Sequence, residues 1–201
     1  MPNPPPTAPH RTPEGSIAPA YFERLYRDAD DPWDYEASPY EAAKYTATLA
    51  ALPRARYRRA AELGCSIGVL TAGLAERADA VLALDVSPEA LDRARARCAR
   101  HAHVRFERRV LPAEAPEGPF DLAVLSEVGY YLSPADLDRL AERLAGAVEP
   151  GGHLALVHWT GETDYPQTAA AVHARFLSDG LWRPLRDGHT AHYRLDVLER
   201  A

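Results

Sequence analysis

The sequence predicts an α/β protein built on a mostly parallel sheet with helices on both faces. Segments of strand and helix character alternate from residue 58 onward, and several of the strands are apolar runs of the buried type. The chain has 201 residues, 46% hydrophobic and 26% charged, which suffices for one domain with a substantial core. Seven strands are expected, at residues 58–63, 80–85, 103–107, 120–126, 153–159, 181–185 and 191–198.

The N-terminal part differs in composition from the rest. Seven of the eighteen prolines fall within Met1–Pro19, which is predicted to be a disordered leader. Residues 20–201 are predicted to form a single domain whose first part, about 20–56, is a helical lid. Within it, Ser38 and Pro39 have the residue types of an N-cap and a first helical position.

The later helices are also marked by their first residues. Ser87 and Pro88 open a helix that runs to about Arg100, and Ser133 opens another with a Ser-x-x-Asp variant of the capping box. Glu149-Pro150-Gly151-Gly152 is expected to end that helix. The turn-like pair Asp187-Gly188 is expected to join the last two strands as an antiparallel pair.

Charge and composition exclude several classes of protein. The chain carries 23 basic and 29 acidic residues, a net charge of −6, which argues against a nucleic-acid partner. No apolar run approaches the ~20 residues that cross a bilayer and no secretory signal is readable, so a cytoplasmic protein is expected. Cys65 and Cys98 form no CxxC pair. The histidine pairs His101/His103 and His189/His192 lack further ligands at metal-binding spacing, so they are expected to be surface residues and no metal is predicted.

Two strand ends carry the pattern of a nucleoside site. In a doubly wound sheet, ligands bind at the carboxyl ends of the strands where the strand order reverses. The first strand ends in the turn Glu62-Leu63-Gly64-Cys65-Ser66-Ile67-Gly68, whose glycines let a ligand approach the backbone. The second ends at Asp85, where an acid can accept hydrogen bonds from both ribose hydroxyls. A plain tight turn and a helix-capping aspartate are the alternatives, although Ser87 already supplies the cap.

The charge of the turn distinguishes two kinds of cofactor. A dinucleotide enzyme uses Gly-x-Gly-x-x-Gly around a pyrophosphate, whereas this turn reads Glu-x-Gly-x-x-x-Gly. The carboxylate of Glu62 would repel a pyrophosphate and suit a cationic ligand. S-adenosylmethionine carries an ammonium and a sulfonium, so the turn favours a methyltransferase.

Further motifs carry a resemblance to a known family. They are Phe22-Glu23-Arg24-Leu25-Tyr26, Asp31-Pro32-Trp33, Tyr40-Glu41 with Lys44-Tyr45, the stretch 126–132 and Pro150-Gly151-Gly152. The turn, Asp85, the strand Phe120–Ser126 and Pro150-Gly151-Gly152 resemble class I S-adenosylmethionine-dependent methyltransferases. The other motifs look, more narrowly, like the rhizobial nodulation protein S family. Founding members of that family N-methylate an amino sugar on a chito-oligosaccharide. The resemblance covers about Tyr21 to the C-terminus and implies a Rossmann-like seven-stranded sheet with an antiparallel last strand.

The resemblance also implies roles at the cofactor. Glu62 would act near the ammonium, directly or through water, Asp85 would hold the ribose hydroxyls, and Val86 would lie against adenine. Trp33, Tyr40 and Lys44 would cover the site or meet the cofactor carboxylate. The other implied contacts are Gly64, Cys65, Ser66 and Gly68 along the methionine part, with Val110, Leu111 and Ser126 completing the set.

Two positions depart from the family pattern. Ser66 stands where the family often has glycine, which adds a small side chain near the cofactor. Arg109 stands where the family usually has an aspartate that reads the adenine amino group, and an arginine cannot accept that hydrogen bond. Adenine recognition is therefore expected to rest on backbone groups such as the Leu111 amide, or the cofactor affinity is expected to be reduced.

Residues at the reacting end are predicted from their places after the strands. An ammonium acceptor must lose a proton before it attacks, and Glu127 is the first candidate to contact it, the alternative being a carboxylate that opens a helix. His158, at the end of the fifth strand, is a second catalytic candidate, with a structural role as the alternative. The candidate acceptor-binding residues are Tyr130 and Tyr131, of which one is expected to be core, and Asp164 and Tyr165 in a loop.

The predicted function is therefore methyl transfer from S-adenosylmethionine to a small molecule or an oligosaccharide. The nitrogen of an amino sugar or another small amine is the favoured acceptor. O-methylation of a small secondary metabolite and non-catalytic cofactor binding remain as alternatives. Neither a nucleic acid nor a membrane is expected as a partner.

Overall fold

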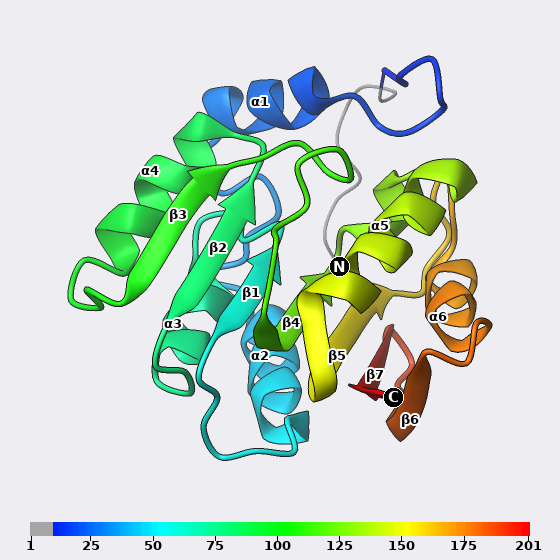
Figure 1. The fold of residues 1–201 in the computed structure, drawn as a ribbon. Coiled ribbons are helices and arrows are strands. Elements are labelled where there is room, and N and C mark those ends of the chain that lie inside the picture. The colour runs from blue at the N-terminus through cyan, green and yellow to red at the C-terminus, as the bar shows by residue number, and fades with distance from the viewer. Residues whose placement is uncertain (1–9) are drawn as a thin grey trace.

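The structure, a computed structural model, describes residues 10–201 and contains one seven-stranded sheet (Figure 1). The strand order is β3-β2-β1-β4-β5-β7-β6, and β7 alone runs antiparallel to its neighbours. The predicted fold class, a mostly parallel sheet with an antiparallel last strand, is confirmed. The strands are β1 Ala60–Leu63, β2 Val81–Asp85, β3 Val104–Arg108, β4 Phe120–Ser126, β5 Val148–Trp159, β6 Trp182–His189 and β7 Tyr193–Arg200.

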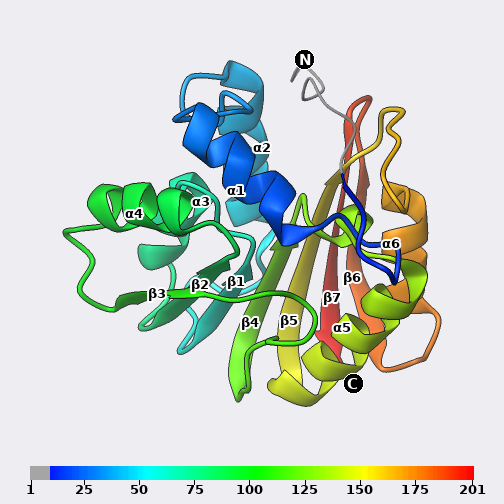
Figure 2. The same ribbon diagram turned by 90° about the horizontal axis from the view of Figure 1, so that it is seen from above.

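Helices cover both faces of the sheet, with α3 and α4 on one face and α5 on the other (Figure 2). Three predicted N-caps are confirmed, because the hydroxyls of Ser38, Ser87 and Ser133 accept hydrogen bonds from backbone amides three residues on. Each cap is followed by a proline at the first helical position. The helices are α1 Pro19–Asp28, α2 Pro39–Ala51, α3 Val69–Ala75, α4 Pro88–Arg97, α5 Pro134–Ala147 and α6 Ala169–Leu177, with a 3₁₀ turn η1 at Gly129–Tyr131.

Several strand boundaries differ from the prediction, and the shifts at the starts of β1 and β5 have clear physical causes. β1 begins two residues late because the amides of Arg58 and Arg59 donate to the carboxylate of Asp121, at 2.9 and 2.8 Å, before the strand pairing begins. β5 begins at Val148, five residues early, because that residue already pairs with Phe120.

The predicted turn at Asp187-Gly188 is wrong. Both residues lie in β6, where Gly188 pairs with Leu195. The turn falls at Thr190, whose hydroxyl accepts hydrogen bonds from the amides of His192 and Tyr193 and thereby closes it.

The prediction of a disordered leader is wrong for residues 10–18; the part before residue 10 lies outside the described residues. Arg11 and Ile17 form an isolated antiparallel bridge, and the Ile17 amide donates to the Tyr131 carbonyl at 2.8 Å. Ile17 is buried in the main core cluster. Ser16 is also buried, because its hydroxyl donates to Asp136 and accepts from the Ser133 amide. Two well-placed side chains thus hold a segment whose composition predicts disorder.

The sheet order reverses at β1, which pairs with β2 on one side and β4 on the other. Ligand sites in such sheets lie at the carboxyl ends of the strands at this point. Figure 1 shows α1 lying across the carboxyl ends of β2 and β3, so this N-terminal helix covers the carboxyl end of that part of the sheet. Among residues 10–201, no helix has the length and apolar character needed to cross a membrane.

Candidate functional site

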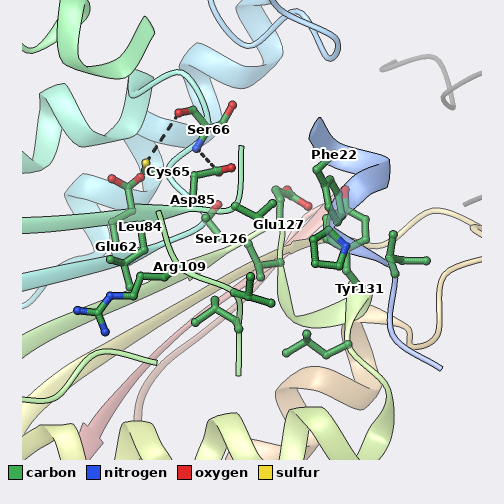
Figure 3. Close-up of a pocket in the computed structure, with 18 of the residues that line it drawn as sticks. Phe22, Glu62, Cys65, Ser66, Leu84, Asp85, Arg109, Ser126, Glu127 and Tyr131 are labelled. Carbon is green, nitrogen blue, oxygen red and sulfur yellow. Dashed lines mark hydrogen bonds between the residues drawn. The ribbon is translucent and has the colours of Figure 1, made fainter. Parts of the chain in front are cut away.

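A cavity of about 360 Å³ lies at the carboxyl ends of the strands around this reversal point. It is lined by the turn after β1, the ends of β2 and β4, the segment after β3, and residues from the N-terminal part. Figure 3 shows Glu62, Cys65, Ser66 and Asp85 toward one end, and Phe22 and Tyr131 toward the other. The sequence-predicted residues that line it are Trp33, Glu62, Gly64, Cys65, Ser66, Asp85, Val86, Val110, Leu111, Ser126, Glu127 and Tyr131.

Glu62 brings a buried carboxyl group to the cavity wall. Its Oε2 accepts a hydrogen bond from the Thr71 hydroxyl at 2.6 Å, and the residue is 2% exposed. Burial raises the pKa of Glu62 to about 8, opposed by the Thr71 hydrogen bond and aided by the nearby charge of Asp85. A cation bound beside it would lower that pKa again, so the carboxyl group is suited to a positively charged ligand.

Asp85 is held at the end of β2 by two backbone amides. Ser66 N donates to Oδ2 at 2.8 Å and Ser87 N donates to Oδ1 at 2.9 Å. Burial raises the pKa of Asp85, although these amides oppose the rise. Each carboxylate oxygen keeps capacity for a further hydrogen bond, which fits the pair of vicinal hydroxyls expected of a ribose.

Ser66 has a left-handed backbone, with φ of 51°. Glycine adopts this conformation without strain, whereas a residue with a Cβ adopts it at a steric cost. Here the Ser66 hydroxyl shares a hydrogen bond with the hydroxyl of Tyr26 and so ties α1 to the turn after β1. The side chain that departs from the family pattern therefore anchors the roof of the cavity.

Gly64 and Gly68, in the turn after β1, each lack room for a side chain, but the neighbours that fill the space differ. A Cβ on Gly64 would lie 2.2 Å from Cγ2 of Val128, so the absent side chain lets the loop after β4 approach the turn. A Cβ on Gly68 would meet the Ala94 backbone at 2.9 Å. Gly68 therefore serves the packing of α3 on α4 and does not line the cavity.

Arg109 lines the cavity, but its guanidinium is engaged elsewhere. Nε and Nη2 donate to Oε2 of Glu107 at 3.0 and 2.6 Å. The Val110 amide is also engaged, because it donates to the Glu114 carboxylate at 2.6 Å. The next residue on this wall of the cavity is Leu111.

Glu127 follows β4 and is fixed by three donors. Lys44 Nζ lies 2.6 Å from Oε1, while the Tyr130 hydroxyl and the Trp159 amide, the latter at 3.0 Å, donate to Oε2. Its φ of 58° is unusual for a residue with a side chain, and such strain concentrates at functional sites. With its side chain 10% exposed, Glu127 presents a held carboxylate to the cavity.

The geometry speaks against the predicted catalytic role of His158. The residue is fully buried, and its Nε2 accepts a hydrogen bond from the Gly129 amide at 3.0 Å. Its Nδ1 lies 3.1 Å from Nε2 of His173, whose Nδ1 lies 2.7 Å from Asp196. The nitrogen that could act as a base is therefore occupied. Burial lowers the pKa of His158, so it supports the loop after β4 as a neutral ring.

The predicted acceptor residues divide into two groups. Tyr131 lines the cavity, whereas Tyr130 and Tyr165 pack behind it with ring centroids 5.1 Å apart. The Tyr130 hydroxyl reaches Glu127 instead. Asp164 does not line the cavity either, and its carbonyl accepts a hydrogen bond from Arg11.

Two N-terminal residues lie away from their predicted places. Lys44 is 2% exposed between Glu41 and Glu127 and does not line the cavity, so it is not placed to meet a cofactor carboxylate. Tyr40 packs against His192 and Tyr193, with Lys44 Nζ 5.3 Å from its ring centroid. Trp33, in contrast, lines the cavity as predicted.

Several residues that line the cavity were not predicted from the sequence. Phe22 and Tyr26 lie in a motif that carried the resemblance, so a signal for them was present. The composition of residues 12–19 gave no such signal, although this segment forms one end of the wall. Its members, with their neighbours from α5, are Thr12, Glu14, Ser16, Ile17, Pro19, Asp136 and Arg139.

Among the described residues, one group has the geometry of a metal site. Ligand atoms of Asp187, His189 and Asp196 lie within 4.8 Å of one another. The guanidinium of Arg194 stands 2.8 Å from Asp196 and 3.8 Å from Asp187, so it already supplies positive charge there. The predicted surface position holds for His189 and His192, whereas His101 is buried.

The strand order, the single antiparallel strand and the cavity at the reversal point define the fold of a class I methyltransferase. A putative methyltransferase from Pseudomonas syringae shares it, with 42% identity, a TM-score of 0.71 and coverage of 80% of this chain and 99% of that one. The N-methyltransferase NodS from Bradyrhizobium japonicum, in complex with S-adenosyl-L-homocysteine, has a TM-score of 0.80 at 24% identity, covering 89% and 97%.

The chain belongs to the nodulation protein S family. The family model described as nodulation protein S (NodS) matches residues 21–150. Nodulation protein S of Rhizobium tropici is 35% identical over 137 residues, which are 66% of this chain. The match spans 58% of the R. tropici protein. The resemblance inferred from the sequence motifs is thereby confirmed.

Proposed function

We propose that this protein transfers the methyl group of S-adenosylmethionine to the nitrogen of a small acceptor, an amino sugar or another small amine. The observation that carries the proposal is that three strand ends, those of β1, β2 and β4, each bring a carboxyl group to one cavity, from Glu62, Asp85 and Glu127. Membership of the nodulation protein S family supports the same reaction.

The residues at one end of the cavity fit this cofactor. Glu62 is a buried acid whose hydrogen-bond partner among the described residues is the neutral Thr71 hydroxyl, and the cofactor ammonium would supply a compensating cation. Asp85 offers two oxygens oriented by backbone amides to the ribose hydroxyls. Gly64 adds no side chain to this wall, and the Leu111 backbone is the proposed adenine contact in place of the family aspartate.

Glu127 is the residue proposed to meet the acceptor. Both of its oxygens are positioned by protein donors, yet Oε1 accepts only from Lys44 in the described structure and retains a lone pair. Because Glu127 lines the cavity, an acceptor amine can donate to this oxygen. Phe22 and Tyr131 provide an apolar wall beside it, which helps to exclude water.

The chemistry asked of the protein is alignment and proton removal. When bound, S-adenosylmethionine supplies a methyl carbon already activated by its sulfonium. The acceptor nitrogen must hold a free electron pair before it attacks, so its extra proton passes to Glu127 or to water. The new bond joins nitrogen to the methyl carbon, and the electrons of the broken bond to carbon stay on sulfur. Holding both partners in line in the cavity supplies the remaining acceleration.

A labelled-methyl assay tests the proposal. The protein is incubated with methyl-labelled S-adenosylmethionine and separate panels of amino sugars, simple amines and phenols. We expect label on nitrogen, with a strong loss in Glu127→Gln. Label on phenols alone would instead establish the O-methyltransferase alternative. Cofactor binding without transfer to any panel member, even at high protein concentration, would favour a non-catalytic binding protein.

A further inference from the structure

Lys44 lies between two carboxylates behind the cavity wall. Its Nζ is 2.6 Å from Oε1 of Glu127, and 3.0 and 2.9 Å from the two oxygens of Glu41. The side chains of Lys44 and Glu41 are 2% and 4% exposed. Lys44 is the only lysine in the sequence, and its contact with Glu127 joins α2 to the loop after β4.

The charges of this cluster do not cancel. Burial disfavours the ammonium of Lys44, but the carboxylates of Glu127 and Glu41 outweigh it and raise its pKa. Burial also raises the pKa of Glu41, partly offset by Lys44. With both acids ionised, one ammonium faces two carboxylates, so the cluster is one positive charge short. Glu127 is the member that lines the cavity and can be reached by another cation.

The other groups around Glu127 are neutral or acidic. In the part of the chain that the structure describes, Lys44 is the one cationic side chain within hydrogen-bond distance of it. Burial raises the pKa of every surrounding tyrosine that senses its charge, so their hydroxyls stay protonated. These tyrosines are Tyr35, Tyr40, Tyr45, Tyr130, Tyr131 and Tyr165.

The backbone of Glu127 also depends on its partners. A φ of 58° is strained for a residue with a Cβ, and it persists where the surroundings determine it. The Glu127 amide donates to the Val157 carbonyl at 2.8 Å, which fixes the backbone from β5. Lys44 then fixes the side chain from the opposite element, α2.

We propose that Lys44 is a positioning residue for methyl transfer, which holds Glu127 as a carboxylate facing the cavity and leaves the cluster short of one positive charge. An acceptor that enters as an ammonium supplies the missing charge. This inference rests on the proposed function and deepens it, because it assigns the acceptor class of the site to protonated amines and not to phenols or other neutral hydroxyls.

The test combines Lys44→Met, Glu127→Gln and the double variant. In Lys44→Met we expect kcat/KM for an amine acceptor to fall about tenfold or more, while the Kd for S-adenosylhomocysteine stays within about twofold. In the Glu127→Gln background the same change should cost little more, because Lys44 acts through Glu127. Fully additive losses, or a parallel loss of S-adenosylhomocysteine binding, would overturn the inference.

The pH profile separates this role from simple packing. The low-pH limb of kcat/KM should move to higher pH in Lys44→Met, because the ammonium that favours the carboxylate is gone. It should move to lower pH in Glu41→Gln, which removes the competing acid, and should partly recover in Lys44→Arg. If Lys44→Met does not fold, Glu41→Gln and Lys44→Arg still decide, since limbs that do not move contradict the inference. A wild type that methylates no amine refutes the proposed function instead.

Discussion

The backbone amide of Ser66 donates a hydrogen bond to Oδ2 of Asp85 at 2.8 Å. This contact joins the turn after β1 to the end of β2 across the point where the cofactor is proposed to lie. The same turn is tied to α1 through the hydroxyls of Ser66 and Tyr26. The residue proposed to hold the ribose therefore also orders the turn proposed to line the methionine part.

Replacing Asp85 tests its proposed ribose contact. Asp85→Ala should weaken S-adenosylhomocysteine binding by about 5- to 150-fold, since charged hydrogen bonds are worth about 1–3 kcal/mol. Asp85→Asn, which keeps one acceptor oxygen, should lose less. Calorimetric titration measures both, with Asp92→Ala on the exposed face of α4 as the matched control. An Asp85→Ala protein that binds as tightly as the wild type refutes the role.

Cofactor binding should release a proton through Glu62. In the free protein its pKa is raised to about 8, so it is mostly protonated at pH 7, whereas an ammonium beside it favours the carboxylate. Affinity should therefore rise with pH up to about 8 and level off above it. Titration at pH 7 in buffers of different ionisation enthalpy measures the proton, and Glu62→Gln should abolish its release. Equal heats in all buffers for the wild type would contradict the account.

The same group sets a pH dependence of stability in the cofactor-free protein. Between the ordinary value of 4.5 and about 8, the folded state binds a proton that the unfolded state lacks. The free energy of unfolding should therefore fall as the pH rises through this window, by up to about 1.4 kcal/mol per pH unit from this group. Urea unfolding of the wild type and of Glu62→Gln at a series of pH values measures this effect. The free energy of unfolding should fall more steeply with pH in the wild type than in Glu62→Gln.

Gly64 is predicted to be required for the close approach of Val128. In Gly64→Ala the new Cβ would lie 2.2 Å from Cγ2 of Val128, and the alanine backbone would have to keep a φ of 80°. The free energy of unfolding should therefore fall by about 1–3 kcal/mol. Adding Val128→Ala should recover the part that is due to the clash. Chemical unfolding of the single and double variants measures both components. No recovery in the double variant would mean that the backbone conformation alone carries the cost.

Ser16 is predicted to latch the N-terminal segment over the cavity. Ser16→Ala leaves the Ser133 amide and the Asp136 carboxylate without their buried partner, which should cost about 1–3 kcal/mol. Proteolysis within residues 11–15 should become faster, and the KM of the acceptor should rise more than the Kd of S-adenosylhomocysteine. Ser178→Ala, an exposed serine on the end of α6, is the control. Unchanged proteolysis would show that the segment is held without this latch.

Local signals predicted most of the fold. Ser38, Ser87 and Ser133 mark helix starts because a hydroxyl that caps an amide acts within three residues, and apolar runs marked the strands. The sequence was less informative where a distant partner decides. Asp121, 63 residues along the chain, takes the amide of Arg58 before β1. The last turn was missed for another reason: its partners are local, but Asp187-Gly188 is the commoner turn pair and the Thr190 hydroxyl closes the turn instead.

The candidate site shows the same division. Residues on strand ends, such as Glu62, Asp85 and Glu127, were predictable because topology places strand ends together. Lys44 and His158 were not, since their surroundings come from partners 83 and 29 residues away. The contribution of residues 12–19 was hidden by their proline content, because composition does not reveal that Ser16 and Ile17 have buried partners.

The most direct test of the central claim is a calorimetric titration with S-adenosylmethionine and, separately, with a reduced nicotinamide dinucleotide. The cavity presents the buried acid Glu62 at the turn where a pyrophosphate would require hydrogen-bond donors. We therefore expect S-adenosylmethionine to bind and the dinucleotide not to bind. The affinity for S-adenosylmethionine should be lower in Asp85→Ala and in Glu62→Gln. Binding of the dinucleotide alone would contradict the account.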